Sequence, residues 1–139
     1  MKKSGPIIVI EDDEEDQMLL DEIFRNLNFD NRVIFFSDGN DALRYLNATD
    51  EYPLLILSDI NMPRIDGFEI RDKVSKNERL RLIPYLFFTT GVNNEAVEAA
   101  YAMCVQGFFI KPARMSDMQN TIRKIVEYWQ ECCAPGPFN

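Results

Sequence analysis

Histidine is absent from this chain of 139 residues. Any mechanism in which the protein supplies its own histidine as a base, a metal ligand or a phosphoryl carrier is therefore excluded. Without histidine, we expect a bound metal ion to be held by oxygen atoms, and oxygen ligands favour Mg²⁺ or another hard cation.

Cysteine is scarce, and long apolar runs are missing. Cys104, Cys132 and Cys133 are an odd number without regular spacing, which indicates free thiols in a reducing compartment. No apolar stretch is long enough for a transmembrane helix. The opening Met1–Lys3 could begin a signal peptide, but only a short apolar run follows it before an acidic block. We therefore expect a cytoplasmic protein that is not secreted.

Basic residues are outnumbered, because 15 lysines and arginines face 23 aspartates and glutamates, so that the net charge is 15 − 23 = −8. Nucleic acids and anionic membranes attract basic surfaces, and we expect neither as a partner. The length and the 46% apolar content fit one globular domain. We predict that this domain covers residues 1–132 and that residues 133–139 form a C-terminal tail.

Five short apolar runs are continuous rather than alternating, which is typical of parallel strands buried on both faces. Segments with helical spacing separate them. This alternation predicts an α/β fold, doubly wound as (βα)5, in which helices cover both faces of a five-stranded parallel sheet. The predicted strands are Pro6–Ile10, Val33–Phe36, Leu54–Leu57, Tyr85–Phe88 and Gly107–Ile110.

Each predicted helix carries an apolar stripe at helical spacing. The stripe of the fourth helix is predicted to extend from Ala96 to Cys104, and that of the last helix from Met115 to Trp129. The stripes of the first three helices contain Leu20, Ile23 and Phe24, then Ala42 and Leu46, then Ile70 and Val74.

Polar residues follow four of the predicted strands at the ends where ligands bind in open α/β sheets. Acidic residues from Glu11 to Asp16 follow the first strand, Asp59 the third, Thr89 the fourth and Lys111 the fifth. Crowded carboxylates repel one another, and a divalent cation relieves that repulsion. A carboxylate can also act as a nucleophile, with a cation and a lysine neutralising a transferred phosphoryl group. We interpret residues 14–16 as ordinary acids of a helix N-terminus.

Four motifs, in this order, resemble the receiver domain of two-component response regulators, the CheY-like family. The spacing is 30 residues from Asp59 to Thr89 and 22 from Thr89 to Lys111. The resemblance covers residues from about 5 to about 131, and it implies the strand order 2-1-3-4-5 of CheY. The motifs are Val9–Asp13, Leu57–Pro63 followed by Asp66-Gly67, Phe88–Thr90 and Phe109–Pro112.

The resemblance implies a role for each matching residue. Asp59 would accept the phosphoryl group, and Lys111 and Thr89 would contact it. Thr89 and Phe108 would form the conformational switch. The implied ligands of Mg²⁺, which Mn²⁺ or Ca²⁺ could replace in a crystal, are Glu11, Asp12, Asp59 and the backbone carbonyl of Asn61.

Two local features also follow from the resemblance. Alignment of the first strand makes Glu11 and Asp12 the metal-binding pair, so that Asp13 would begin the first helix. The Lys111–Pro112 peptide bond is expected to be cis, which would direct the lysine toward the site.

The implied function is that of a single-domain response regulator, a switch rather than a turnover enzyme. A histidine kinase or a phosphotransfer protein would phosphorylate it, and the signal would pass to an unidentified output protein. A homodimer could form through the face of the fourth helix, fifth strand and fifth helix. The acidic residues after the first strand and the acidic first helix resemble those of small regulators encoded beside phytochrome-type or other hybrid sensor kinases.

Three alternatives remain. A degenerate receiver would act only as a protein-binding module, although Glu11, Asp12, Asp59, Thr89 and Lys111 are all intact. A flavodoxin-like cofactor binder would need a phosphate-binding loop rich in Ser, Thr and Gly where this chain has acids. A haloacid-dehalogenase-type phosphatase would need a second aspartate two residues after the nucleophile, where this chain has Asn61.

Overall fold

Five parallel strands form the centre of the computed structural model, which describes residues 4–135. Their hydrogen-bonded order is β2-β1-β3-β4-β5, so the expected order is confirmed. The opening Met1–Lys3 and the tail residues 136–139 lie outside the described residues. The strands are β1 (Ile7–Ile10), β2 (Val33–Phe36), β3 (Leu55–Ser58), β4 (Tyr85–Thr89) and β5 (Gly107–Ile110).

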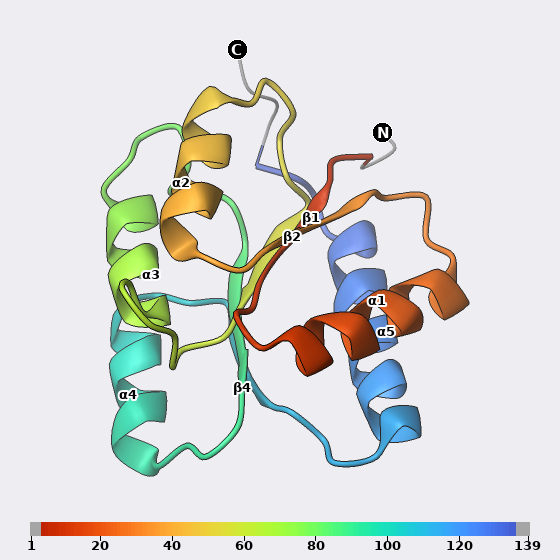
Figure 1. The fold of residues 1–139 in the computed structure, drawn as a ribbon. Helices are drawn as coiled ribbons and strands as arrows, with labels where there is room; N and C mark the ends of the chain where they lie inside the picture. Colours follow the sequence, from red (N-terminus) through yellow and green to blue (C-terminus); the bar gives the residue numbers. More distant parts are fainter. Residues whose placement is uncertain (1–3, 136–139) are drawn as a thin grey trace.

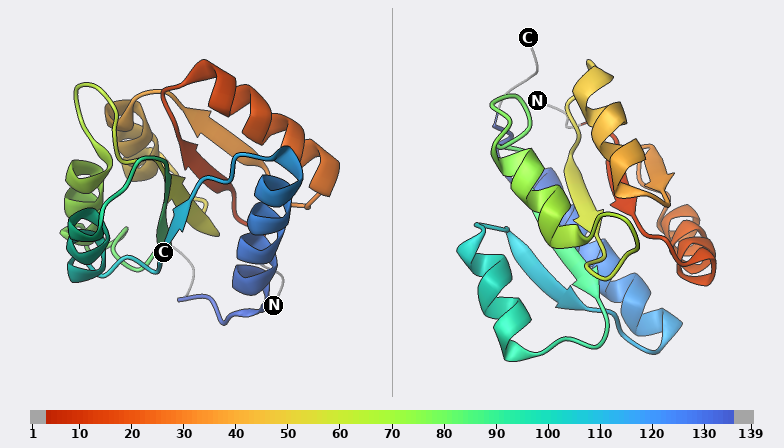
Figure 2. Two further views of the ribbon diagram at one scale, coloured as in Figure 1. Left: turned by 90° about the horizontal axis from the view of Figure 1, so that it is seen from below. Right: turned by 60° about the vertical axis from the view of Figure 1, so that its left-hand side comes forward.

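Five helices cover the two faces of the sheet, which confirms the doubly wound arrangement. α1 (Glu14–Leu27) and α5 (Met115–Glu131) lie on one face (Figure 1). α2 (Gly39–Ala48), α3 (Gly67–Ser75) and α4 (Asn94–Ala102) lie on the other, and both layers can be followed in Figure 2. None of the helices in residues 4–135 is both long and apolar enough to cross a bilayer.

The central strands separate two apolar cores. All four residues of β1 and all four of β3 are buried, because helices pack against both faces of these strands. Ile8 and Ile10 face the core beneath α2, α3 and α4, whereas Ile7 and Val9 face the core beneath α1 and α5. The continuous apolar runs of β1, β3 and β4 therefore correspond to fully buried strands, whereas the two edge strands, β2 and β5, are only partly buried.

Side-chain caps determine where several helices begin. Asp13 is the N-cap of α1 and accepts a hydrogen bond from the Asp16 amide at 3.0 Å, which confirms that the helix starts there. Asp66 caps α3 in a reciprocal capping box with Glu69. These caps hold the helix starts close to the strand ends that carry the polar residues.

The fourth helix is shorter than predicted. α4 ends at Ala102, and Cys104 is exposed with φ of 62°, so its inclusion in the apolar stripe was wrong. A buried side chain of α3 holds this turn, since Arg71 donates to the carbonyls of Met103 and Cys104, each at 3.0 Å. These contacts come from a distant segment and satisfy carbonyls at the helix end. Helical spacing alone therefore does not reveal where α4 stops.

Candidate functional site

The carboxyl ends of β1, β3, β4 and β5 bring the predicted polar residues together. Thr89 donates its hydroxyl hydrogen to Asp59 Oδ1, and Lys111 Nζ donates to Asp59 Oδ2 at 3.1 Å. The backbone N–H of Ile60 also donates to Asp59 Oδ1, at 2.7 Å. The carboxylate of Asp59 therefore has donors on both oxygens, and its side chain is 12% exposed. Its orientation is determined before any ligand arrives.

Lys111 has three carboxylate partners, which come from three different segments. Its ammonium donates to Glu11, to Asp16 at 2.8 Å and to Asp59 at 3.1 Å. Only 5% of the Lys111 side chain is exposed. Burial by itself would lower the pKa of Lys111, but the hydrogen bonds that its ammonium donates to Asp16 and Glu11 outweigh burial and raise the pKa. The lysine is therefore cationic at neutral pH.

Three carboxylates form a cluster that can hold a metal ion. One oxygen each of Glu11, Asp12 and Asp59 lie within 4.8 Å of one another. Burial raises the pKa of Glu11 to about 7, and the charge of Asp59 acts in the same direction, although the hydrogen bond from Lys111 opposes it. A divalent cation would favour the ionised form of Glu11, and oxygen-only ligands suit a hard cation. The residues therefore fit such an ion.

Six residues at this edge of the sheet form the "carboxylate site". They are Glu11, Asp12, Asp16, Asp59, Thr89 and Lys111.

The loop after β3 needs a glycine next to the site. A Cβ atom added to Gly67 would lie 2.3 Å from the Asp59 carbonyl oxygen, which is too close for any other residue without backbone movement. The Gly67 amide donates to the Ile60 carbonyl at 2.8 Å and closes the loop. Asn61 lies exposed in this loop, and the role of its carbonyl as a metal ligand stays a prediction.

Asp16 is a site residue that sequence reasoning missed. Its position in the sequence predicts an ordinary helix-terminal acid, but its carboxylate reaches Lys111 from the first turn of α1. The sequence holds a partial signal, because the N-cap at Asp13 places Asp16 on the first turn, next to the end of β1. The contact itself depends on the path of the β5–α5 connection.

The expectation of a cis peptide bond at Lys111–Pro112 was wrong, because residues 4–135 contain no cis bond. Proline lowers the preference for trans without removing it. The lysine reaches the site with a trans bond, and the Lys111 amide donates to the Thr89 carbonyl at 2.8 Å.

Phe108 belongs to a chain of aromatic contacts beneath the site. Its ring lies edge-on to that of Phe87, with centroids 5.9 Å apart, and Phe68 contacts Phe87 at 5.3 Å. Phe87 and Phe108 are partners in the β4–β5 register, two residues before Thr89 and its partner Ile110. Phe108 is half-buried, so its ring has both packed and open sides.

Comparisons with known proteins agree with this geometry. A family model described as the response regulator receiver domain matches residues 7–123. Response regulator Rcp1 of Synechocystis sp. is 31% identical over 130 residues, 90% of this chain and 88% of that protein. The probable methanogenesis regulatory protein FilR2 of Methanothrix harundinacea is 33% identical over 136 residues, 94% of this chain and 88% of that protein.

Solved structures show the same likeness. The phosphorylated cyanobacterial phytochrome response regulator RcpA superimposes with a TM-score of 0.85 at 28% identity, covering 95% of this chain and 99% of that one. The Mn²⁺-bound form of Rcp1 gives a TM-score of 0.83 at 30% identity, covering 95% and 99%.

Proposed function

We propose that this chain, which belongs to the response regulator receiver domain family, works as a phosphorylation switch with Asp59 as its phosphoryl acceptor. Receiver domains are signalling switches, generally not turnover enzymes, and they interact with histidine kinases or phosphotransfer proteins and with output proteins. One observation carries the proposal. Asp59 lies between the hydroxyl of Thr89 and the ammonium of Lys111, and it is one of the three carboxylates that can hold a metal ion.

The residues of the carboxylate site can each take part in the transfer. An oxygen of Asp59 would form a bond to the phosphorus of a partner's phosphohistidine, while the phosphorus–nitrogen bond breaks and its electron pair returns to the imidazole. Lys111 would neutralise part of the phosphoryl charge. Thr89 already donates to Asp59 and would donate to a phosphoryl oxygen instead.

A divalent cation, for which we propose Mg²⁺, would be held by Glu11, Asp12, Asp59 and the backbone carbonyl of Asn61. When bound, it supplies positive charge that offsets the repulsion between the carboxylates and the phosphoryl group. The carboxylate cluster supports this proposal, as does the Mn²⁺-bound form of the relative Rcp1.

The signal would leave through the edge of the sheet at β5. A change in the hydrogen bonds of Thr89 would let Phe108 repack, and Phe108 can switch only by packing because it has no hydroxyl. Three large apolar side chains are exposed on the elements around this edge. They are Tyr101 on α4, Ile110 on β5 and Tyr128 on α5, and they define the "output face".

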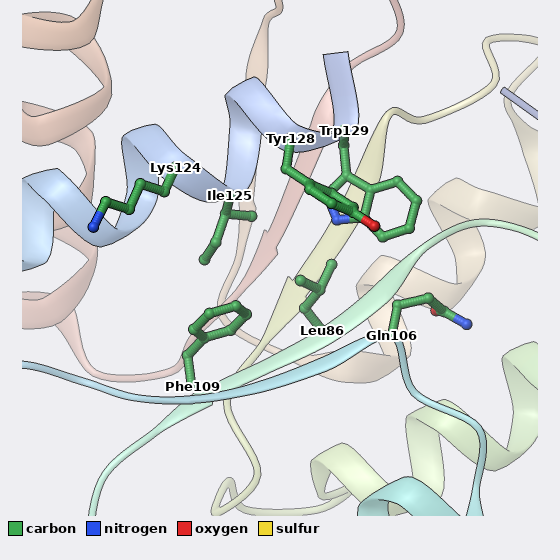
Figure 3. Close-up of a pocket in the computed structure, with 7 residues that line it drawn as sticks. All are labelled: Leu86, Gln106, Phe109, Lys124, Ile125, Tyr128 and Trp129. Atoms are coloured by element: carbon green, nitrogen blue, oxygen red, sulfur yellow. The ribbon is translucent and has the colours of Figure 1, made fainter. Parts of the chain in front are cut away.

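A cavity of about 260 Å³ lies between α5 and the last two strands, next to this face. Figure 3 shows Phe109 and Leu86 on the strands, opposite Ile125 and Trp129 on α5. We propose that the phosphorylated protein associates through the output face, with a second copy or with another output protein. The likeness to the cyanobacterial phytochrome response regulator RcpA supports a phytochrome-type kinase as the donor, and we propose that the transfer takes place in the cytoplasm.

Replacing Asp59 tests the acceptor. Asp59→Asn keeps the shape of the side chain but removes the nucleophile, so phosphate incorporation from acetyl phosphate with Mg²⁺ should be lost. Asp21→Asn removes a partly exposed acid of α1 that pairs with Arg25, and this variant should be phosphorylated like the parent protein. Incorporation that persists in Asp59→Asn would refute the assignment.

Beryllofluoride separates a working receiver from a degenerate one that acts only as a protein-binding module. With Mg²⁺ present, this phosphoryl mimic should bind at Asp59 and change the ¹⁹F NMR spectrum. Absence of binding to the parent protein would favour the degenerate module.

A further inference from the structure

Asp16 is the partner of Lys111 that the sequence did not reveal. Its carboxylate accepts a hydrogen bond from Lys111 Nζ at 2.8 Å, a shorter distance than the 3.1 Å to Asp59. The Asp16 side chain is 38% exposed, whereas that of Lys111 is 5% exposed. Asp16 therefore stands at the solvent edge of the site and holds the lysine from the side of α1.

The three carboxylates on Lys111 differ in a second respect. Glu11 and Asp59 also belong to the cluster that can hold a divalent cation, and Asp16 does not. A cation in that cluster would partly neutralise the carboxylates of Glu11 and Asp59, so that they would attract the Lys111 ammonium less. The cation would also repel this ammonium directly. Within residues 4–135, Asp16 is thus the carboxylate contact of Lys111 that lies outside the cluster.

We propose that Asp16 is a positioning residue that keeps the Lys111 ammonium beside Asp59 when the divalent cation is bound. It acts through Lys111 and touches neither the cation nor the phosphoryl group. The inference rests on the proposed function, because it assigns Asp16 a part in that same transfer. Without Asp16, the cation would repel the Lys111 ammonium away from Asp59, and the ammonium could no longer contact an oxygen of the phosphoryl group there.

The backbone around Asp16 is suited to this task. Its amide donates to the Asp13 cap at 3.0 Å, and α1 is anchored to the core by Leu20, Ile23 and Phe24. On the other side, the Lys111 amide is bonded to β4 through the Thr89 carbonyl at 2.8 Å. The ion pair therefore joins two fixed segments, and only side chains need to move when a ligand arrives.

The test compares Asp16→Asn with Glu15→Gln, which removes one charge from the same helical turn at an exposed position. At saturating Mg²⁺, Asp16→Asn should bind beryllofluoride about tenfold more weakly, because it replaces a hydrogen bond between two charged groups by one to a neutral amide. Glu15→Gln should bind it as the parent protein does.

A second measurement follows the lysine directly. In the Mg²⁺-loaded parent protein, the ¹⁵N NMR signal of the Lys111 ammonium, identified by its loss in Lys111→Arg, should be sharp and protected from exchange. It should broaden in Asp16→Asn and stay sharp in Glu15→Gln. The affinity for Mg²⁺ should fall much less in Asp16→Asn than in Glu11→Gln, which removes a proposed ligand.

Four outcomes would overturn the role of Asp16. They are equal behaviour of Asp16→Asn and Glu15→Gln, tighter beryllofluoride binding in Asp16→Asn, weaker binding with an unchanged Lys111 signal, and a loss of Mg²⁺ affinity as large as in Glu11→Gln. Failure of the parent protein to bind beryllofluoride would instead refute the proposed function, and the Lys111 signal would still report on the positioning.

Discussion

The carboxylate site and the output face lie close together and are built in opposite ways. In the carboxylate site the ammonium of Lys111 meets three carboxylates, and Glu11 and Thr89 are almost fully buried. On the output face, by contrast, Tyr128 is 63% exposed and Ile110 is 62% exposed. The first region has little freedom to change without a new charge partner, whereas the second can rearrange with little loss of packing.

This difference suggests how a local charge could produce a distant response. Charge added at Asp59 would be balanced most directly by Lys111, Thr89 or a cation, because Lys111 and Thr89 already donate to its carboxylate. Thr89 and Phe87 are paired in register with Ile110 and Phe108, so we expect a movement of Thr89 to affect β5. β5 lies at an edge of the sheet and is hydrogen-bonded to one strand, β4. It therefore resists movement less than a strand that has a neighbour on each side.

The largest effect is expected where the buried charge is removed. Lys111→Met would leave the buried carboxylate of Glu11 without its cation and should lower the free energy of unfolding by about 3 kcal/mol at pH 8 without divalent ions. The loss should be smaller at pH 5, where Glu11 can bind a proton. Urea unfolding at both pH values measures this.

Lys76→Met is the matched control, because Lys76 pairs with Asp72 at 2.9 Å but is 74% exposed. It should change the free energy of unfolding by less than about 0.5 kcal/mol. Similar losses in the two lysine variants would contradict the contrast between buried and exposed charge.

A somewhat smaller effect is expected from the ionisation of Glu11. Its pKa is about 7 in the folded protein, against an ordinary value of 4.5, so the folded state holds the proton more tightly. The stability that this group contributes is complete below about pH 4.5 and is lost as the pH rises through 7. Relative to Glu11→Gln, the parent protein should therefore lose about 2 kcal/mol between pH 5 and pH 8.

Urea unfolding of both proteins across that range measures the difference, and Glu11→Gln is the control for all other titrating groups. Saturating Mg²⁺ should reduce the loss, because a cation stabilises the ionised carboxylate. A stability difference that does not depend on pH would show that Glu11 titrates normally.

A moderate effect is expected at Phe108, which lies between the two regions. Phe108→Leu removes the edge-on contact with Phe87 and should cost about 1 kcal/mol of unfolding free energy. Beryllofluoride affinity should stay within about twofold of the parent value, since Phe108 has no polar contact with the site. A change of tenfold or more in beryllofluoride affinity would show that Phe108 contributes to ligand binding at the carboxylate site.

The smallest effect on stability is expected on the output face. Tyr128→Ser removes an exposed ring and should change the free energy of unfolding by about 0.5 kcal/mol or less. Association of the beryllofluoride-bound protein with itself should nevertheless weaken, as measured by sedimentation. If the beryllofluoride-bound parent protein stays monomeric at high protein concentration, the homodimer is ruled out and another protein must be the partner.

The sequence by itself determined the architecture and most of the carboxylate site. Continuous apolar runs marked the buried strands, and the topology of a parallel sheet places the residues after each strand at one edge. The sequence could therefore predict that five residues meet, because each ends a strand or lies within two residues of a strand end; they are Glu11, Asp12, Asp59, Thr89 and Lys111. Resemblance to a known family added their roles.

Only the tertiary structure decided which carboxylates share Lys111, where α4 ends and that the Lys111–Pro112 bond is trans. The ion pair between Asp16 and Lys111 joins residues 95 positions apart, and Arg71 holds carbonyls 32 and 33 positions away. Local propensity and spacing act over a few residues, whereas these contacts depend on how complete elements pack against one another. That dependence on packing is the physical reason why the pattern of the chain could not predict them.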